Sequence, residues 1–85
     1  QGYSLLDVRT SAEFALGALP NAINIPLDDL RSRFDEIPDT PLIVYCQVGQ
    51  RGHTATVLIR EKGRHAVNLD GGFKTWIASQ GINNN

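Results

Sequence analysis

The stretch LIVYCQVGQRGHTATVLI, residues 42–59, decides the fold because it leads from a predicted strand directly into a predicted helix. The run LIVY is apolar throughout, which is typical of a strand covered on both faces of a parallel sheet. In residues 52–62 the apolar side chains recur at helical spacing. Between the strand and the helix lies a polar loop that begins with Cys46, the only cysteine of the chain.

The rest of the chain continues this alternation of strands and helices. The expected strands are residues 4–8, 22–25, 42–45 and 66–69, and the expected helices are residues 12–15, 27–37, 52–62 and 72–79. Thr10 or Ser11 is a candidate cap for the first helix, which is expected to stop at Gly17. Strands that alternate with helices predict an α/β fold with a central, mainly parallel sheet flanked by helices.

Two of the expected helices depend on the spacing of a few apolar side chains, which predicts one buried face for each. The inward-facing residues are expected to be Leu27, Leu30, Phe34 and Ile37 in the helix 27–37, and Phe73, Trp76 and Ile77 in the helix 72–79. Pro38 is expected to end the first of these two helices.

Length and composition limit the chain to one small domain, residues 1–85. Its 85 residues are 41% hydrophobic, and its eight basic and nine acidic residues give a net charge of −1. These charges are scattered, so no basic stripe is present to hold a nucleic acid. A single cysteine forms no internal disulfide, and neither a signal peptide nor a membrane span is evident, so a cytoplasmic protein without a membrane partner is expected.

Cys46 occupies the place where an active site is expected in this class of fold. Ligands of open α/β sheets bind beyond the carboxyl ends of the strands, and Cys46 follows the most buried predicted strand. The helix that comes next presents unpartnered amides, and a helix amino terminus with a nearby arginine favours a thiolate. Gly49 allows the loop to turn with a positive φ so that its amides point inward, and Arg51 adds a permanent positive charge.

A second interpretation of Cys46 stays open. Free cysteine is among the most buried residue types, so a lone cysteine at a strand end is often a small core residue without chemistry. The combination of a strand, a cysteine, four residues that include a glycine, an arginine and a helix favours the reactive thiol.

Four motifs, taken together, resemble the rhodanese-homology domain of the single-domain sulfurtransferase type. The motifs are Leu6-Asp7-Val8-Arg9 followed by Glu13-Phe14, residues 17–26 (GALPNAINIP), residues 44–51 (VYCQVGQR), and Leu69-Asp70-Gly71-Gly72-Phe73 with Trp76. The resemblance implies a three-layer rhodanese-like fold, and it implies that the family's first strand and helix are largely absent, so the chain is expected to be a fragment of a longer protein. Within the family, residues 46–52 (CQVGQRG) are similar to the rhodanese domain fused to coenzyme A-disulfide reductases and related NADH oxidases.

The resemblance also implies roles for the site residues. Cys46 would be the nucleophile that carries a persulfide, held by the amides of Gln47, Val48, Gly49, Gln50 and Arg51. Supporting roles fall to Asp7, which would anchor loops by hydrogen bonds, to Arg9, which would pair with an acid such as Glu13, and to Gly71 and Gly72, which would allow close backbone approach beside the loop. No metal is implied.

The implied partners are a small-molecule sulfur donor and a thiol acceptor. No cofactor is implied in the domain itself, whereas FAD, NAD(P)H and coenzyme A are possible in a larger parent protein with a covalently linked disulfide-reductase domain. Two other functions stay open. One is a phosphatase or arsenate reductase, although the related loops in those enzymes are one residue longer. The other is a non-catalytic or redox-regulatory module.

Overall fold

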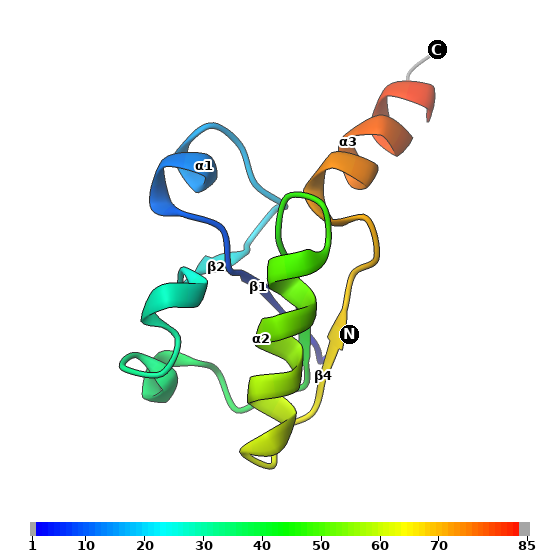
Figure 1. Ribbon diagram of the computed structural model, residues 1–85. Helices are drawn as coiled ribbons and strands as arrows, with labels where there is room; N and C mark the ends of the chain where they lie inside the picture. Colours follow the sequence, from blue (N-terminus) through cyan, green and yellow to red (C-terminus); the bar gives the residue numbers. More distant parts are fainter. Residues whose placement is uncertain (1, 84–85) are drawn as a thin grey trace.

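The computed structural model describes the backbone of residues 2–83 and the side chains of residues 2–77 (Figure 1). The elements follow the chain in the order β1 (Ser4–Asp7), α1 (Ser11–Ala15), β2 (Ile23–Asn24), the 3₁₀ turns η1 (Leu27–Asp29) and η2 (Phe34–Glu36), β3 (Leu42–Tyr45), α2 (Gln50–Glu61), β4 (Ala66–Asn68) and α3 (Gly72–Asn83). The predicted α/β fold is confirmed.

The four strands form one parallel sheet with the order β2-β1-β3-β4. The two central strands, β1 and β3, pair over four positions, from Ser4 opposite Leu42 to Asp7 opposite Tyr45. Because the strands are parallel, their carboxyl ends lie at the same edge of the sheet. This edge brings Asp7, Tyr45 and Asn68 close to the beginning of the cysteine loop, the name used below for Cys46–Arg51.

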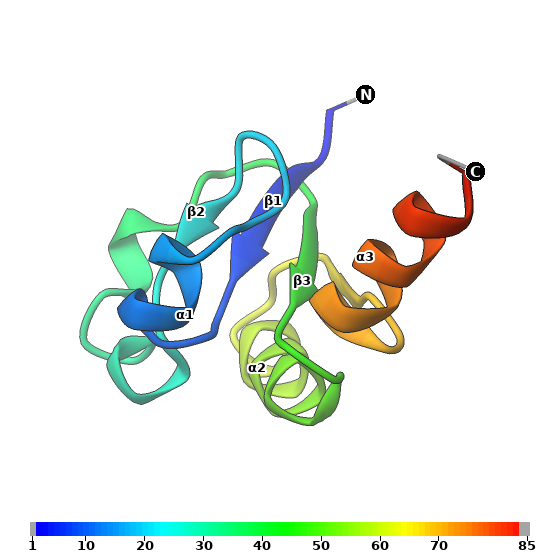
Figure 2. The ribbon, with the colours of Figure 1, turned by 90° about the horizontal axis from the view of Figure 1, so that it is seen from above.

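Helices α2 and α3 cover opposite faces of the sheet, as Figure 2 shows. Successive side chains of a strand point to opposite faces. Val44 and Cys46 belong to one buried cluster with Ala55 of α2, whereas Tyr45 between them stacks on Phe73 of α3. The sheet is therefore the middle of three layers, as expected.

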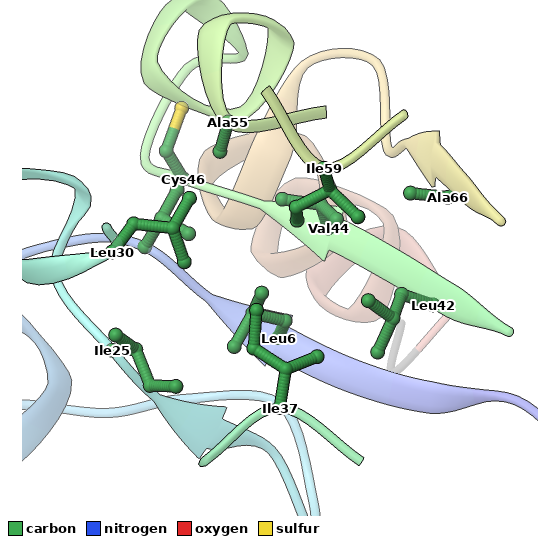
Figure 3. Close-up of a cluster of buried hydrophobic side chains, with 11 residues drawn as sticks. Leu6, Ile25, Leu30, Ile37, Leu42, Val44, Cys46, Ala55, Ile59 and Ala66 are labelled. Atoms are coloured by element: carbon green, nitrogen blue, oxygen red, sulfur yellow. The ribbon is translucent and has the colours of Figure 1, made fainter. Parts of the chain in front are cut away.

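The hydrophobic core lies between the sheet and α2 (Figure 3). It is built by apolar side chains from the strands, from α2 and from the segment that contains η1 and η2. Its buried members are Leu6, Val8, Ile25, Leu30, Ile37, Leu42, Val44, Cys46, Ala55, Ile59 and Ala66. This core fixes the end of β3, and with it the position of Cys46.

The prediction of one helix over residues 27–37 is wrong, because η1 and η2 are separate short turns. Between them the backbone of Arg33 leaves helical geometry, with φ −113° and ψ 21°. The Ser32 hydroxyl donates to the Asp29 carbonyl at 3.0 Å, a local bond that competes with a helical ladder. The apolar spacing still identified the buried side chains, since Leu30 and Ile37 are in the core.

The last two helices differ from prediction at their ends. Helix α2 begins at Gln50, two residues early, because Gly49 with φ 110° already turns the chain into it. Helix α3 extends to Asn83. The inward orientation expected for Ile77 is wrong: Phe73 and Trp76 stack and are half-buried, whereas Ile77 is 48% exposed. Among the described residues, no helix combines the length and the apolar character needed to cross a lipid bilayer.

Candidate functional site

Cys46 is placed at the carboxyl end of β3, directly before the turn into α2. Its side chain is 1% exposed and belongs to the hydrophobic core. The amide of Gly49 donates to Cys46 Sγ at 3.0 Å. Figure 3 shows the sulfur on the side of the sheet that α2 covers. Cys46 is thus a buried free thiol whose sulfur accepts a backbone hydrogen bond from its own loop.

Glycine at position 49 is required by the shape of the cysteine loop. Its φ of 110° lies in the region that favours glycine, and it directs the amide of residue 49 toward Sγ. Its carbonyl accepts the amide of His53 at 2.9 Å and the side-chain amide of Asn68 at 3.3 Å. Within the described loop, Gly49 supplies the hydrogen bond recorded on the sulfur; the wider ring of inward amides from Gln47 to Arg51 stays a prediction.

The amino terminus of α3 closes the other side of the loop. The amides of Phe73 and Lys74 donate to the carbonyls of Cys46 and Gln47 at 2.7 and 3.0 Å. A Cβ on Gly72, whose φ is +61°, would lie 2.3 Å from the Cys46 carbonyl oxygen. The close backbone approach expected at Gly72 is therefore present, and α3 supplies polar partners that the loop lacks in its own sequence.

Gly71 adds to the same contact. Its φ is +78°, and its amide nitrogen lies 3.4 Å from the position that a Cβ on Gly49 would take. The turn before α3 and the turn before α2 are therefore packed backbone to backbone. Both turns depend on residues without a side chain.

Asp7 and Arg9 form a buried ion pair beneath the loop, with side chains that are 0% and 2% exposed. The Arg9 guanidinium donates to both carboxylate oxygens of Asp7, the shortest contact being 2.6 Å from Nη2 to Oδ2. Arg9 is paired with an acid, as expected, but this acid is Asp7 and not Glu13, because Asp7 lies nearer at the end of the same strand and occupies these donors. The anchoring role expected for Asp7 agrees with these contacts and with its acceptance of the Arg9 amide at 2.9 Å.

The remaining donors of Arg9 connect three parts of the site. Nη1 donates to Gln47 Oε1 at 3.0 Å, and Nη2 donates to the Gly17 carbonyl at 2.7 Å. The guanidinium carbon lies 4.3 Å from the ring centre of Phe73 and 5.7 Å from that of Tyr45. Arg9 therefore joins the cysteine loop to the turn after α1 and to α3.

Glu13 is paired with Arg51, the last residue of the cysteine loop. Arg51 Nη1 and Nη2 donate to Glu13 Oε1 and Oε2 at 2.7 and 2.9 Å. Glu13 Oε1 also accepts the Thr10 amide at 2.9 Å, which completes a capping box at the start of α1. The hydrogen bonds from Arg51 hold the pKa of Glu13 at about 2, well below its ordinary 4.5.

The sequence analysis missed this pair, although one signal was available. Thr10 and Glu13 have the spacing of a capping box, which places the Glu13 carboxylate at the amino end of α1. Nothing in the sequence shows that the carboxylate then meets Arg51, 38 residues later. That contact depends on how α1 folds back over the end of the sheet.

We expect the Glu13–Arg51 pair to make stability depend on pH only in acid. The folded pKa of Glu13 is below the unfolded value, so the pair stabilises the fold above about pH 4.5 and loses this effect as the pH falls through about 2. Both side chains are about one-third exposed, so the contribution is about 0.5–1 kcal/mol. Denaturant unfolding of wild type and Glu13→Gln at several pH values gives the free energy of unfolding of each protein. We expect the difference between the two free energies to disappear as the pH falls from 4.5 to 2. A constant difference down to pH 2 would contradict this assignment.

Two further residues escaped the sequence analysis. Tyr45 accepts the Leu19 amide on its hydroxyl at 3.0 Å, and burial raises the pKa of that hydroxyl to about 12. Asn68 has a buried Oδ1 without a partner among the described residues, 2.3 Å from where a Cβ on Gly52 would lie. Tyr45 fixes the segment after α1, and Asn68 joins β4 to the cysteine loop.

The cysteine loop lies between two open depressions of about 540 and 380 Å³. The larger is lined by Val48, Gly49, Gln50, His53, Thr54, Asn68, Asp70 and Gly71, and the smaller by Arg9, Glu13, Leu16, Gly17, Gln47 and Phe73. Within the described part of the chain, no three His, Cys, Asp or Glu side chains are grouped as a metal site requires. The two depressions adjoin the cysteine loop, whereas Cys46 itself is buried and lines neither of them.

Comparison with known proteins gives consistent matches. Residues 1–79 match the family model described as Rhodanese-like domain. A protein of Allochromatium vinosum named sulfurtransferase is 38% identical over 74 residues, which cover 85% of this chain and 69% of that protein.

Two solved structures extend the comparison. A rhodanese-related protein from Thermoplasma volcanium has a TM-score of 0.87 and 33% identity, with 92% of this chain and 79% of that chain covered. Reduced CoADR-RHD from Bacillus anthracis has a TM-score of 0.82 and 46% identity, with 86% of this chain but only 13% of that chain covered. This chain therefore resembles both a small protein of similar length and a small part of a much longer one.

Proposed function

Because the chain belongs to the rhodanese-like domain family, we propose that it is a sulfurtransferase domain that carries sulfane sulfur as a persulfide on Cys46. The observation that supports this most directly is the hydrogen bond from the Gly49 amide to Cys46 Sγ. It places a donor where negative charge develops on a thiolate or on a persulfide. The similarity to a protein named sulfurtransferase, 38% identical over 74 residues, also supports this proposal.

The proposed reaction has two steps without net oxidation. The Cys46 thiolate attacks the outer sulfur of a donor persulfide, a new S–S bond forms on Cys46, and the donor's S–S bond breaks so that its electron pair leaves with the donor thiolate. An acceptor thiolate then attacks the outer sulfur of the Cys46 persulfide. A new S–S bond forms on the acceptor as the S–S bond to Cys46 breaks, so the outer sulfur moves to the acceptor and Cys46 is released as a thiolate.

In this proposal, Arg9 and the amino terminus of α3 have supporting roles. Arg9 fixes Gln47 from below, and the amides of Phe73 and Lys74 fix the carbonyls of Cys46 and Gln47. These contacts hold the backbone of the loop, whose Gly49 amide donates to the sulfur. The short loop from Cys46 to Arg51 suits one sulfur atom better than the tetrahedral anion of a phosphatase.

The likeness to CoADR-RHD, together with the similarity of residues 46–52 to the rhodanese domains fused to coenzyme A-disulfide reductases, supports a narrower proposal. In it, the domain is the sulfur-handling part of a larger flavoenzyme. The partners would be a small-molecule sulfur donor, a thiol acceptor and a covalently linked disulfide-reductase domain. FAD, NAD(P)H and coenzyme A would belong to that larger protein rather than to this domain.

A second candidate is a redox-regulatory module, and the burial of Cys46 favours it. A thiol that is 1% exposed reacts only when its surroundings open, which suits a sensor as well as an enzyme. In this case Cys46 would be alkylated when its surroundings open but would not retain sulfur from a persulfide donor.

The test is the intact mass of the domain before and after incubation with glutathione persulfide. We expect the wild type to gain about 32 Da, the mass of one sulfur atom, and to lose it again on addition of a thiol or of cyanide. Because Cys46 is the only cysteine, no other thiol can account for the gain. Cys46→Ala, treated in the same way, is expected to gain nothing.

The control is alkylation of the wild type with iodoacetamide in the same buffer. A protein that is alkylated but gains no sulfur would refute the sulfurtransferase and favour the regulatory module. A gain of sulfur in Cys46→Ala would show that another group takes up the sulfur.

A further inference from the structure

We propose that Glu13 sets the charge preference of the site, because it occupies the guanidinium of Arg51 and so disfavours anionic sulfur donors relative to donors with little charge at the transferred sulfur. This inference rests on the proposed function of Cys46 and deepens it, since it concerns the class of donor. Glu13 is a positioning residue here and acts through Arg51.

The first observation is that one carboxylate, that of Glu13, pairs with both terminal nitrogens of the Arg51 guanidinium. Both terminal nitrogens donate to Glu13, at 2.7 and 2.9 Å, in the fork geometry with which arginine binds carboxylates and other oxyanions. An anionic donor that approached Arg51 would have to displace Glu13 or meet its negative charge. The pair therefore removes the positive charge that the loop sequence offers.

The second observation is that the other arginine at the site is occupied as well. Arg9 is 2% exposed, and its guanidinium donates to Asp7, to the Gly17 carbonyl and to Gln47. The other side chains of the cysteine loop are neutral. Within the loop and the two arginines that adjoin it, no cation is left without a carboxylate partner.

The third observation is the electrostatic effect of Glu13 on Arg51. The hydrogen bond to Glu13 is the main cause of the raised pKa of the Arg51 guanidinium, and the carboxylate of Asp7 raises it further. Asp28 lines the same small hollow as Arg51.

Glu13→Gln separates the charge from the local structure. Glutamine retains an oxygen that can accept the Thr10 amide, so the capping box of α1 is preserved. Its amide nitrogen cannot accept a hydrogen bond, so one of the two donors of Arg51 becomes free, and the full negative charge is lost. The variant leaves Cys46 and the cysteine loop unchanged in sequence.

The experiment compares thiosulfate, a dianion that releases sulfite when its outer sulfur is transferred, with 2-hydroxyethyl persulfide, which carries at most one negative charge. In Glu13→Gln we expect kcat/KM with thiosulfate to rise roughly 5- to 20-fold, less than the full worth of a charge-assisted hydrogen bond because Arg51 is about one-third exposed. The value of kcat/KM with 2-hydroxyethyl persulfide should change less than about twofold. The thiosulfate gain should shrink at high salt, because exposed charges are screened there.

The matched control is Glu36→Gln. Glu36 accepts two hydrogen bonds from Arg33, at 3.0 and 2.9 Å, so it has the same kind of pair on η2. Glu36 takes no part in the site. Its substitution should leave the ratio of the kcat/KM values for the two sulfur donors as in wild type. Equal changes for both donors in Glu13→Gln, or no change in their ratio, would overturn the proposal.

A second measurement keeps the charge effect apart from sulfur transfer. Iodoacetamide is neutral and iodoacetate is an anion of similar size, and both need the same opening around Cys46, so the ratio of their rates reports charge alone. In Glu13→Gln the ratio of iodoacetate to iodoacetamide rates should rise roughly threefold or more at low salt. A raised ratio without any sulfur uptake would refute the proposed function while supporting the role of Glu13, and an unchanged ratio would refute that role.

Discussion

Arg9→Leu lowers the free energy of unfolding by about 3–5 kcal/mol, which is the result we expect from the loss of one partner of a buried ion pair. Asp7 is fully buried and receives four hydrogen bonds from Arg9, three of them from the guanidinium. Leucine leaves this carboxylate inside the protein without a countercharge. It also removes the cation from the rings of Phe73 and Tyr45. Denaturant unfolding followed by tryptophan fluorescence measures the change.

Two variants show whether the cost comes from the unpaired charge. Arg33→Leu removes an arginine whose side chain is 38% exposed, and it should cost less than about 1 kcal/mol. The double variant Asp7→Leu/Arg9→Leu removes both charges and should recover a large part of the lost stability. A double variant that is less stable than Arg9→Leu would show that the hydrogen bonds to Gly17 and Gln47 matter more than the ion pair.

Gly72→Ala is expected to destabilise the protein by about 3–4 kcal/mol and to slow sulfur uptake by Cys46. The new Cβ would lie 2.3 Å from the Cys46 carbonyl oxygen and 2.8 Å from backbone atoms of Gln47. Backbone cannot rotate away as a side chain can, so α3 must shift. That shift breaks the hydrogen bonds from Phe73 and Lys74 to the loop. Denaturant unfolding and the rate of the 32 Da gain measure the two effects.

Gly63→Ala is the control for the backbone conformation alone. Gly63 also has a positive φ, +85°, but a Cβ there would meet nothing within 4 Å. Its cost should be limited to about 1–2 kcal/mol of backbone strain, without an effect on sulfur uptake. Equal destabilisation by the two substitutions would contradict the clash at Gly72.

The strands and the long helices were predictable because each shows its own pattern of apolar residues, a continuous run or a helical spacing, within one short stretch of sequence. The apolar run at residues 42–45 and the helical spacing after Gly52 led directly to β3 and α2. The segment 27–37 was harder, because its apolar spacing reports only which side chains are buried. Whether the backbone between them is one helix depends on local bonds such as that of Ser32.

At the site, the sequence predicted the place of the cysteine but not the pairing of the charges. The end of a buried strand before a helix is a local feature, so Cys46 and Gly49 could be singled out. The partners of Arg9 and Arg51 depend on distances across the folded chain, and composition alone does not distinguish Asp7 from Glu13 as a partner. The contact of α3 with the loop joins Cys46 to Phe73 and was indicated only by the two glycines before that helix.

If Cys46 carries sulfur as we propose, its membership in the hydrophobic core couples the loading of that sulfur to the folding equilibrium. Cys46 is clustered with Leu30, Val44 and Ala55, in an interior with little spare volume. The unfolded chain accommodates an added sulfur without regard to packing, whereas the folded chain has to make room for it. Sulfur loading and folding then form one thermodynamic cycle. Any difference in the free energy of sulfur loading between the folded and the unfolded chain equals the change in the free energy of unfolding on loading.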